Sequence, residues 1–179
     1  MIWIGVITAF LPLAWVGYGL GNAIDPIKSL YGVSGVSAVI FLLLSLLPST
    51  CKRVCGYNLL RYRRTFGLIA FSYVLLHVLV FIVLDAAGDM AFVVSESLKK
   101  PFVFVGMSAF LILLGMTITS TKQLLKRFSK YHQAVYVAVI LAVTHAFWAQ
   151  KVAGIFEYML VLLAIIFLGE RLIFRMKNL

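Results

Sequence analysis

Residues 131–148 read YHQAVYVAVILAVTHAFW, an almost wholly apolar stretch with a histidine near each end. An α-helix satisfies its own backbone hydrogen bonds inside a bilayer, so we predict a membrane-spanning helix here. An imidazole in hydrocarbon is costly unless it binds something, which makes His132 and His145 candidate functional residues. The third histidine of the chain, His77, lies in another apolar segment.

The whole chain has the composition of a membrane protein. Of its 179 residues, 63% are hydrophobic and 12% are charged, whereas a soluble domain has about 25% charged residues. A spanning helix needs about 20 mostly apolar residues. We predict six spans, over residues 2–20, 33–49, 66–84, 102–119, 133–149 and 153–170. The sequence therefore predicts an all-α bundle of six transmembrane helices forming one domain over residues 1–179, with the first segment retained rather than cleaved as a signal peptide.

Basic residues are distributed unevenly between the predicted loops. Twelve of the sixteen lie on one side of a six-span arrangement: Lys52, Arg53, Arg61, Arg63, Arg64, Lys122, Lys126, Arg127, Lys130, Arg171, Arg175 and Lys177. The other side has Lys28, Lys99, Lys100 and Lys151. The positive-inside rule makes the first side, and with it both termini, cytoplasmic. The net charge of +10 thus reflects topology and contact with anionic membrane lipid rather than nucleic-acid binding.

Between the spans the sequence predicts mostly loops. Residues 21–35 are rich in glycine and are predicted to be irregular. Residues 85–100 are predicted to form a longer outer loop with a short helix over residues 90–98. Cys51 and Cys55 lie in a predicted cytoplasmic loop without zinc-ribbon or thioredoxin spacing, so we interpret them as incidental.

Helix geometry places His77 and His145 at the same depth. His77 lies thirteen residues after Arg64, and His145 lies fifteen after Lys130; at about 1.5 Å per residue, both are roughly 20 Å from the cytoplasmic boundary. Two neutral imidazoles at one depth on two helices can serve as the axial ligands of one haem iron. A mononuclear zinc or copper site is less consistent, because no cysteine or carboxylate lies at that level.

His132 belongs to a different level of the membrane. Thirteen residues separate it from His145, which is about 20 Å along a helix axis, so it stays near the inner boundary. The equivalent position on the other helix, thirteen residues before His77, is Arg64. An inner haem would need a non-histidine ligand, water, or none. Each histidine could alternatively be a structural residue that hydrogen-bonds a neighbouring helix.

Four motifs carry a family resemblance. They are Asp25-Pro26-Ile27-Lys28, Arg61-Tyr62-Arg63-Arg64-Thr65-Phe66-Gly67 with Leu76-His77, Thr119-Ser120-Thr121, and residues 131–148 quoted above. Through them nearly the whole chain resembles the ferric-reductase-like transmembrane family, and within it the haem-binding subunits of methionine-sulfoxide reductase systems. The chain departs from the expected pattern at Phe128, where tryptophan is expected, and at Tyr131, where leucine is expected.

The resemblance implies an electron-transfer subunit of the bacterial inner membrane that carries b-type haem, one or two per chain, and FMN. It implies electron donation by the quinone pool or a cytoplasmic flavin reductase. The implied acceptor is a periplasmic molybdopterin enzyme (MsrP), which reduces methionine sulfoxide in oxidised proteins. His77 and His145 are then expected to ligate an outer haem, and His132 to serve an inner haem or flavin.

Arg61, Arg63 and Arg64 are candidate partners of haem propionates or of a flavin phosphate, because guanidinium groups pair well with both. Topology alone also explains these three arginines. We expect no substrate-reduction site in this chain and find no G-x-G-x-x-G motif, so the electron donor and acceptor should be separate molecules.

Two other functions remain open. One is a ferric or cupric reductase that passes electrons to an external metal ion. The other is a small transporter whose histidines bind a substrate ion, a class that needs acidic residues within the spans. The only candidates are Glu157 and Glu170, which lie at the two ends of the predicted last span.

Overall fold

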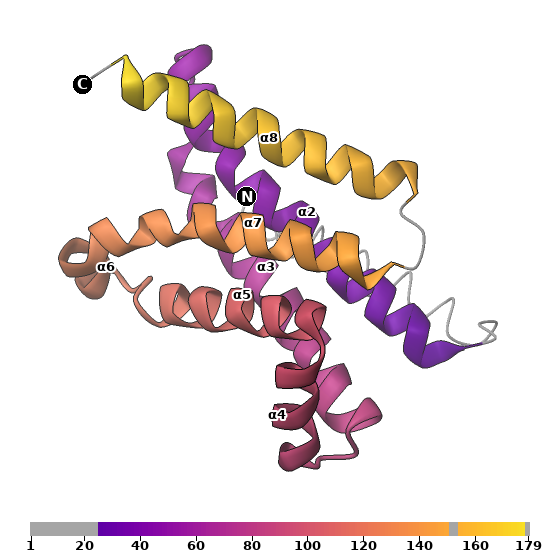
Figure 1. The fold of residues 1–179 in the computed structure, drawn as a ribbon. Helices are drawn as coiled ribbons and strands as arrows, with labels where there is room; N and C mark the ends of the chain where they lie inside the picture. Colours follow the sequence, from indigo (N-terminus) through magenta and orange to yellow (C-terminus); the bar gives the residue numbers. More distant parts are fainter. Residues whose placement is uncertain (1–24, 151–153, 178–179) are drawn as a thin grey trace.

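The computed structural model describes residues 25–150 and 154–177, and the regular structure in these residues is helical (Figure 1). The elements are α2 (Pro26–Val54), α3 (Leu60–Val80), the π-helix η1 (Phe81–Asp85), α4 (Met90–Lys99), α5 (Pro101–Ile118), α6 (Lys122–Phe128), the 3-10 helix η2 (Ser129–Gln133), α7 (Ala134–Ala149) and α8 (Ile155–Met176). The predicted span over residues 2–20 lies outside the described residues.

Four helical segments among the described residues are long and apolar enough to cross a membrane. They are Pro26–Val54, Leu60–Asp85, Pro101–Ile118 and Tyr131–Ala149, and they match the second to fifth predicted spans. α8 covers residues 155–170 of the predicted sixth span, but Glu157 and Glu170 leave only residues 158–169 as an uncharged run between them. The count of six spans and the cytoplasmic location of the termini stay predictions.

α2 begins at Pro26, so the prediction of an irregular loop up to residue 35 is wrong for most of that stretch. The Asp25 carboxylate caps the helix by accepting a hydrogen bond from the backbone N–H of Lys28 at 3.0 Å. A capping aspartate followed by proline in the first turn favours helix initiation. These signals outweigh the low helix propensity of Gly32 and Gly35.

Helices also extend into the predicted cytoplasmic loops. α3 begins at Leu60, six residues before the predicted span, so Arg61, Arg63 and Arg64 lie in its first turns and not in a loop. Residues 122–133 likewise form α6 and η2. Lysine and arginine are good helix formers, so a helix does not have to end where its apolar segment ends. By contrast, α4, α5 and α7 lie within about a residue of their predicted bounds.

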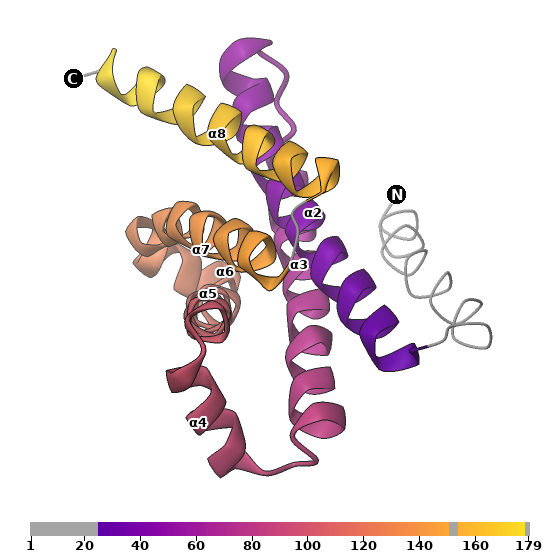
Figure 2. The same cartoon turned by 45° about the vertical axis from the view of Figure 1, so that its right-hand side comes forward.

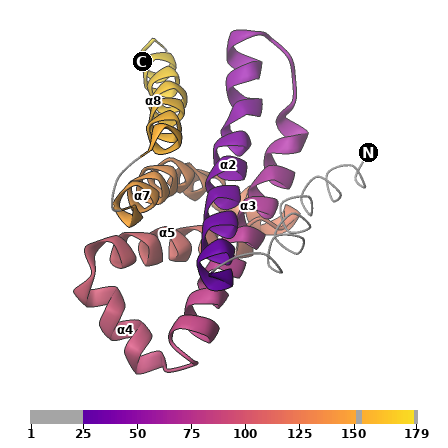
Figure 3. The same ribbon diagram turned by 90° about the vertical axis from the view of Figure 1, so that its right-hand side faces the viewer.

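The helices pack as two crossing pairs. α2 and α3 run antiparallel beside each other (Figures 2 and 3), and α5 lies along α7 (Figure 1), while α8 contacts α2 and α7. The buried apolar core lies where the pairs cross and includes Val39, Leu42, Leu43, Leu46, Ala70, Leu113, Val135, Ala138, Val139, Val143, Leu160 and Ala164. Small core residues such as Ala70 and Ala138, both fully buried, allow helix backbones to approach closely.

One end of the bundle is rich in basic residues. There, Arg53 at the end of α2 forms an ion pair with Glu170 of α8. The guanidinium of Arg171 lies 5.7 Å from the ring centre of Tyr136 at the start of α7. These contacts bring together the end of α2, the start of α7 and the C-terminal part of α8.

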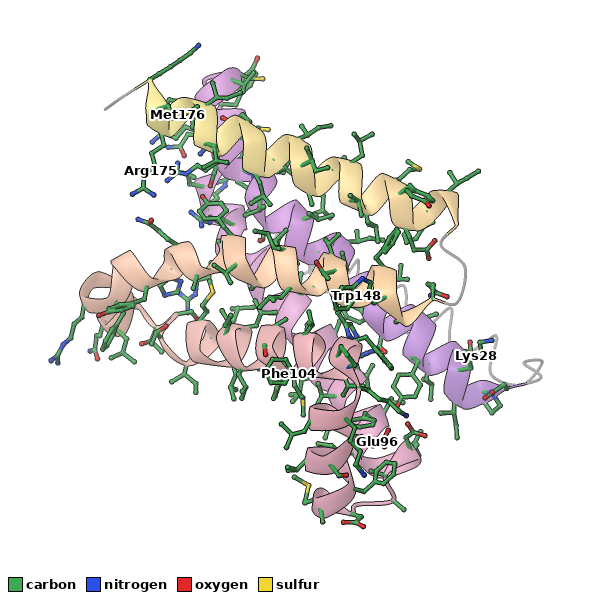
Figure 4. All side chains as sticks on the ribbon, in the orientation of Figure 1. Lys28, Glu96, Phe104, Trp148, Arg175 and Met176 are labelled. Atoms are coloured by element: carbon green, nitrogen blue, oxygen red, sulfur yellow. The ribbon has the colours of Figure 1, made fainter. Side chains whose placement is uncertain are left out.

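The opposite end joins the start of α2 to the end of η1. The Tyr31 hydroxyl donates a hydrogen bond of 3.4 Å to the Asp85 carboxylate. Figure 4 shows Arg175 at one end of the molecule and Lys28 and Glu96 toward the other. This arrangement separates Arg53, Arg171 and Arg175 from the end that carries Asp85.

Candidate functional site

His77 of α3 and His145 of α7 lie next to each other in the structure. Their ring centroids are 6.0 Å apart and their ring planes are inclined by 85°. His77 lies just before the π-helix η1, and π-helical turns occur frequently at functional sites. The structure thus brings together the two histidines that were predicted to lie at one depth.

A backbone carbonyl fixes the tautomer of His145. Its Nδ1 atom lies 2.7 Å from the carbonyl oxygen of Phe102 in α5. A carbonyl oxygen can only accept, so Nδ1 carries the hydrogen and donates it. The neutral ring then has its lone pair on Nε2, which is the atom available to a metal.

A serine hydroxyl has the same effect on His77. The Ser34 hydroxyl donates its single hydrogen to the carbonyl oxygen of Leu30 at 2.6 Å. It therefore accepts from Nδ1 of His77, which lies 3.2 Å away. His77 is left, like His145, with its lone pair on Nε2. Tyr31 packs edge-on against the His77 ring, with 5.3 Å between centroids.

The separation of the two rings is compatible with both imidazoles holding one haem iron. If both Nε2 atoms bound one metal with bonds of about 2 Å, the ring centres would be roughly 6 Å apart, and the observed separation is 6.0 Å. Within the described ranges no group of three or more His, Cys, Asp or Glu residues could hold a metal ion. Two imidazoles would be enough to hold a haem, because its iron is already bound by the porphyrin.

His132 lies apart from this pair, in η2. Its Nε2 atom is 3.3 Å from the hydroxyl of Thr119 at the end of α5. That hydroxyl donates to the carbonyl oxygen of Gly115 at 2.8 Å, so it accepts from Nε2–H of His132. This hydrogen bond joins η2 to α5, which is the kind of structural role that the sequence left open for His132. The lone pair of the neutral ring then lies on Nδ1.

An apolar groove of about 330 Å³ lies beside the contact between His132 and Thr119. Its lining residues are Leu111, Ile112, Gly115, Met116, Thr119, Phe128, Tyr131 and Ala134. The groove combines aliphatic walls from α5 with two aromatic side chains and one hydroxyl. Such a lining can receive an apolar or aromatic molecule and offers it few polar contacts.

The three candidate arginines lie on the first turns of α3 and do not contact a histidine of the described chain. Arg61 donates a hydrogen bond to the Tyr62 hydroxyl at 3.0 Å, and its guanidinium lies 4.8 Å from the Tyr62 ring centre. Arg64 is exposed and Arg63 is half-buried.

Sequence reasoning missed the groups that hold the two histidine rings. Ser34 and the Phe102 carbonyl supply the acceptors, while Gly35 and Gly106 pack directly against the rings. The spacing of residues along one helix does not reveal such contacts, because each joins two different helices. Glycines within apolar segments were the one available signal, since a glycine inside a helix commonly has a packing reason.

Comparisons with known proteins show the family to which the chain belongs. Residues 31–143 match the model of the family described as ferric reductase like transmembrane component. The chain is 32% identical over 158 residues to proteins from Brucella ovis, Brucella canis and Brucella suis, covering 84% of this chain and 71% of each relative. Each relative is named as the haem-binding subunit MsrQ of protein-methionine-sulfoxide reductase.

The matched region contains α3 with His77, α5, and α7 as far as residue 143, and it ends two residues before His145. The four apolar helices and the family match identify an integral, multi-pass membrane protein. The chain belongs to the ferric-reductase-like transmembrane family and, within it, to the MsrQ proteins.

Proposed function

We propose that the chain is a haem-binding electron-transfer subunit in which His77 and His145 ligate one b-type haem iron through Nε2. The observation that carries this proposal is the pairing of two imidazoles, 6.0 Å apart, each with Nδ1 engaged by an oxygen atom. The name of the relatives supports haem binding. A bound haem would accept and release one electron at a time.

The residues around the pair bind and orient rather than react. Ser34 and the Phe102 carbonyl hold each ring in the tautomer that a metal requires. Tyr31 covers one edge of the His77 ring, and Tyr31 in turn contacts Asp85. Tyr31 therefore links Asp85 to the proposed ligand His77. In this proposal an electron leaves the haem toward the external acceptor at this end of the molecule.

The donor side lies, in this proposal, near His132. The apolar groove beside Thr119 supports a site there for an apolar or aromatic electron donor. The proposed donors are the quinone pool or a cytoplasmic flavin reductase, and FMN is a second proposed cofactor. Arg61, Arg63 and Arg64 at the start of α3 are the proposed partners of an anionic cofactor group.

The proposed acceptor is a periplasmic molybdopterin enzyme of the MsrP type, with the chain forming a single domain in the bacterial inner membrane. The relatives' name supports a methionine-sulfoxide reductase system. The family description favours one second candidate, reduction of an external ferric ion.

An electron-transfer assay separates these two functions. The purified protein is reduced with dithionite, freed of reductant and mixed with a purified MsrP-type enzyme and methionine sulfoxide. We expect the haem to be reoxidised only when the enzyme and its substrate are both present. Equally fast reoxidation by a ferric chelate alone would instead identify a ferric reductase.

Substitution of His132 tests the proposed inner site. Glutamine can still donate a hydrogen bond to Thr119, whereas alanine cannot. Because Nε2 of His132 is engaged by Thr119, we expect His132→Gln and His132→Ala to keep the wild-type ratio of haem to protein, and both to slow reduction by the donor. A ratio reduced by half would show that His132 ligates a second haem. If the donor reduces the haem of His132→Gln as fast as that of the wild type, His132 has only a structural role.

A further inference from the structure

Gly106 of α5 lies in direct contact with the ring of His145. A Cβ atom added at Gly106 would be 2.6 Å from Nδ1 and 2.8 Å from Cε1 of that ring. Both distances are far below a normal contact between heavy atoms. Any side chain at this position would therefore push His145 away. Gly67 of α3, by contrast, has no such neighbour within 4 Å.

The missing side chain also explains how His145 reaches a helix carbonyl. In an α-helix each Cα–Cβ bond tilts toward the N-terminus, so a side chain covers the turn before its own Cα. Residue 106 therefore covers the carbonyl of Phe102, four residues earlier. With glycine at this position the carbonyl is uncovered, and Nδ1–H of His145 approaches to 2.7 Å.

The acceptor for His77 is built differently. Gly35 of α2 lies against this ring, and a Cβ atom added there would be 3.1 Å from Cε1 and 3.2 Å from Nδ1. The hydrogen-bond acceptor is the neighbouring Ser34 hydroxyl at 3.2 Å, which already donates to Leu30. The backbone of Tyr31 also interacts with the His77 ring. Nδ1 of His77 thus has the longer side-chain hydrogen bond, to a hydroxyl, whereas Nδ1 of His145 has a short hydrogen bond to a carbonyl.

This difference has a chemical consequence for a bound iron. A strong acceptor at Nδ1–H increases the electron density of the imidazole and makes Nε2 a better donor to the metal. A stronger donor ligand stabilises the ferric state and lowers the reduction potential. We propose that Gly106 and Ser34 are positioning residues that give the two haem ligands unequal donor strength, with His145 the stronger. This inference rests on the proposed ligation by both histidines.

The variants Gly106→Ala and Gly67→Ala form a matched pair, because each adds one methyl group to a glycine inside an apolar helix. We expect Gly106→Ala to weaken haem binding about tenfold, in the range found when groups that support a metal ligand are removed. Gly67→Ala should bind haem like the wild type, because its added methyl group meets open space. Equal haem affinity of the two variants would overturn the role of Gly106.

Ser34→Ala and Ser72→Ala form a second pair that makes a smaller change. The Ser72 hydroxyl is exposed and donates to the Leu68 carbonyl of its own helix at 3.0 Å. Ser34→Ala should keep its haem and shift the midpoint potential upward, because His77 loses its hydroxyl acceptor. Ser72→Ala should leave the potential unchanged. Identical potentials in the two variants would overturn the role of Ser34.

These outcomes are distinct from failure of the proposed function. A wild-type protein without bound haem, or with a haem that lacks two histidine ligands, would refute the proposed function itself. The wild-type protein could instead bind a low-spin haem whose affinity is unchanged by Gly106→Ala and whose midpoint potential is unchanged by Ser34→Ala. That result would refute only the unequal donor strength of the two ligands.

Discussion

Replacing His145 with alanine is expected to abolish the haem signal of the purified protein, and replacing His77 is expected to do the same. Each imidazole lies with its Nε2 lone pair available, 6.0 Å from its partner ring, and the rest of the described site offers no cluster of alternative ligands. Haem content is measured by the pyridine haemochrome method after expression with excess haem. We expect at least about a tenfold loss in each variant.

The controls separate ligand loss from misfolding. Each histidine is also changed to glycine, and the protein is titrated with free imidazole, which can occupy the vacated space. Recovery of a low-spin spectrum identifies a lost ligand rather than a collapsed bundle. Ser72→Ala, at an exposed site on the same helix as His77, should keep its haem. Full haem retention in His77→Ala and His145→Ala would refute the assignment.

Removal of Arg53 is expected to produce the largest loss of stability among single charge substitutions in the described helices. The Arg53 side chain is 11% exposed and that of its partner Glu170 is 21% exposed. Thr50 completes the network by donating to Glu170 at 3.1 Å. Breaking a partly buried ion pair leaves one charge without its partner, which costs about 1 to 3 kcal/mol, between the values for exposed and buried pairs. We expect this loss of stability in Arg53→Met. It is measured as a lower midpoint temperature of thermal unfolding in detergent micelles.

Two further variants make this prediction specific. Arg53→Met combined with Glu170→Met should recover most of the loss, because no unpaired charge remains. Lys100→Met removes the partner of Glu96, an ion pair in which the lysine side chain is 54% exposed. An exposed pair contributes about 1 kcal/mol or less. If Arg53→Met is no more destabilising than Lys100→Met, the pair does not join α2 and α8 energetically.

The bounds of a helix were predictable where its own apolar residues determine where it begins and ends. α5 and α7 have uninterrupted apolar runs, and their observed bounds lie within a residue of those predicted. The bounds of α2 and α3 were not predicted well. Hydrophobicity indicates which residues lie in the membrane, but it does not indicate where a helix begins or ends. Asp25 starts α2 well before its apolar run, and α3 includes Arg61, Arg63 and Arg64.

The histidine pair was predictable for a similar reason, since depth along a helix depends only on residue number and rise. The groups behind the rings were not. Gly106 contacts His145, and Ser34 contacts His77, across helix interfaces that are set by packing of the whole bundle. The same holds for the contact of His132 with Thr119, which joins residues of neighbouring helices and was not expected from spacing.

Ligation of one iron by both His77 and His145 is tested most directly by low-temperature EPR spectroscopy of the oxidised protein. The ring planes are inclined by 85°, and nearly perpendicular axial imidazoles give a strongly anisotropic low-spin ferric signal. We expect this signal in the wild-type protein and its loss in both His77→Ala and His145→Ala. A high-spin ferric signal in the wild type, or an unchanged low-spin signal in either variant, would contradict ligation by this pair.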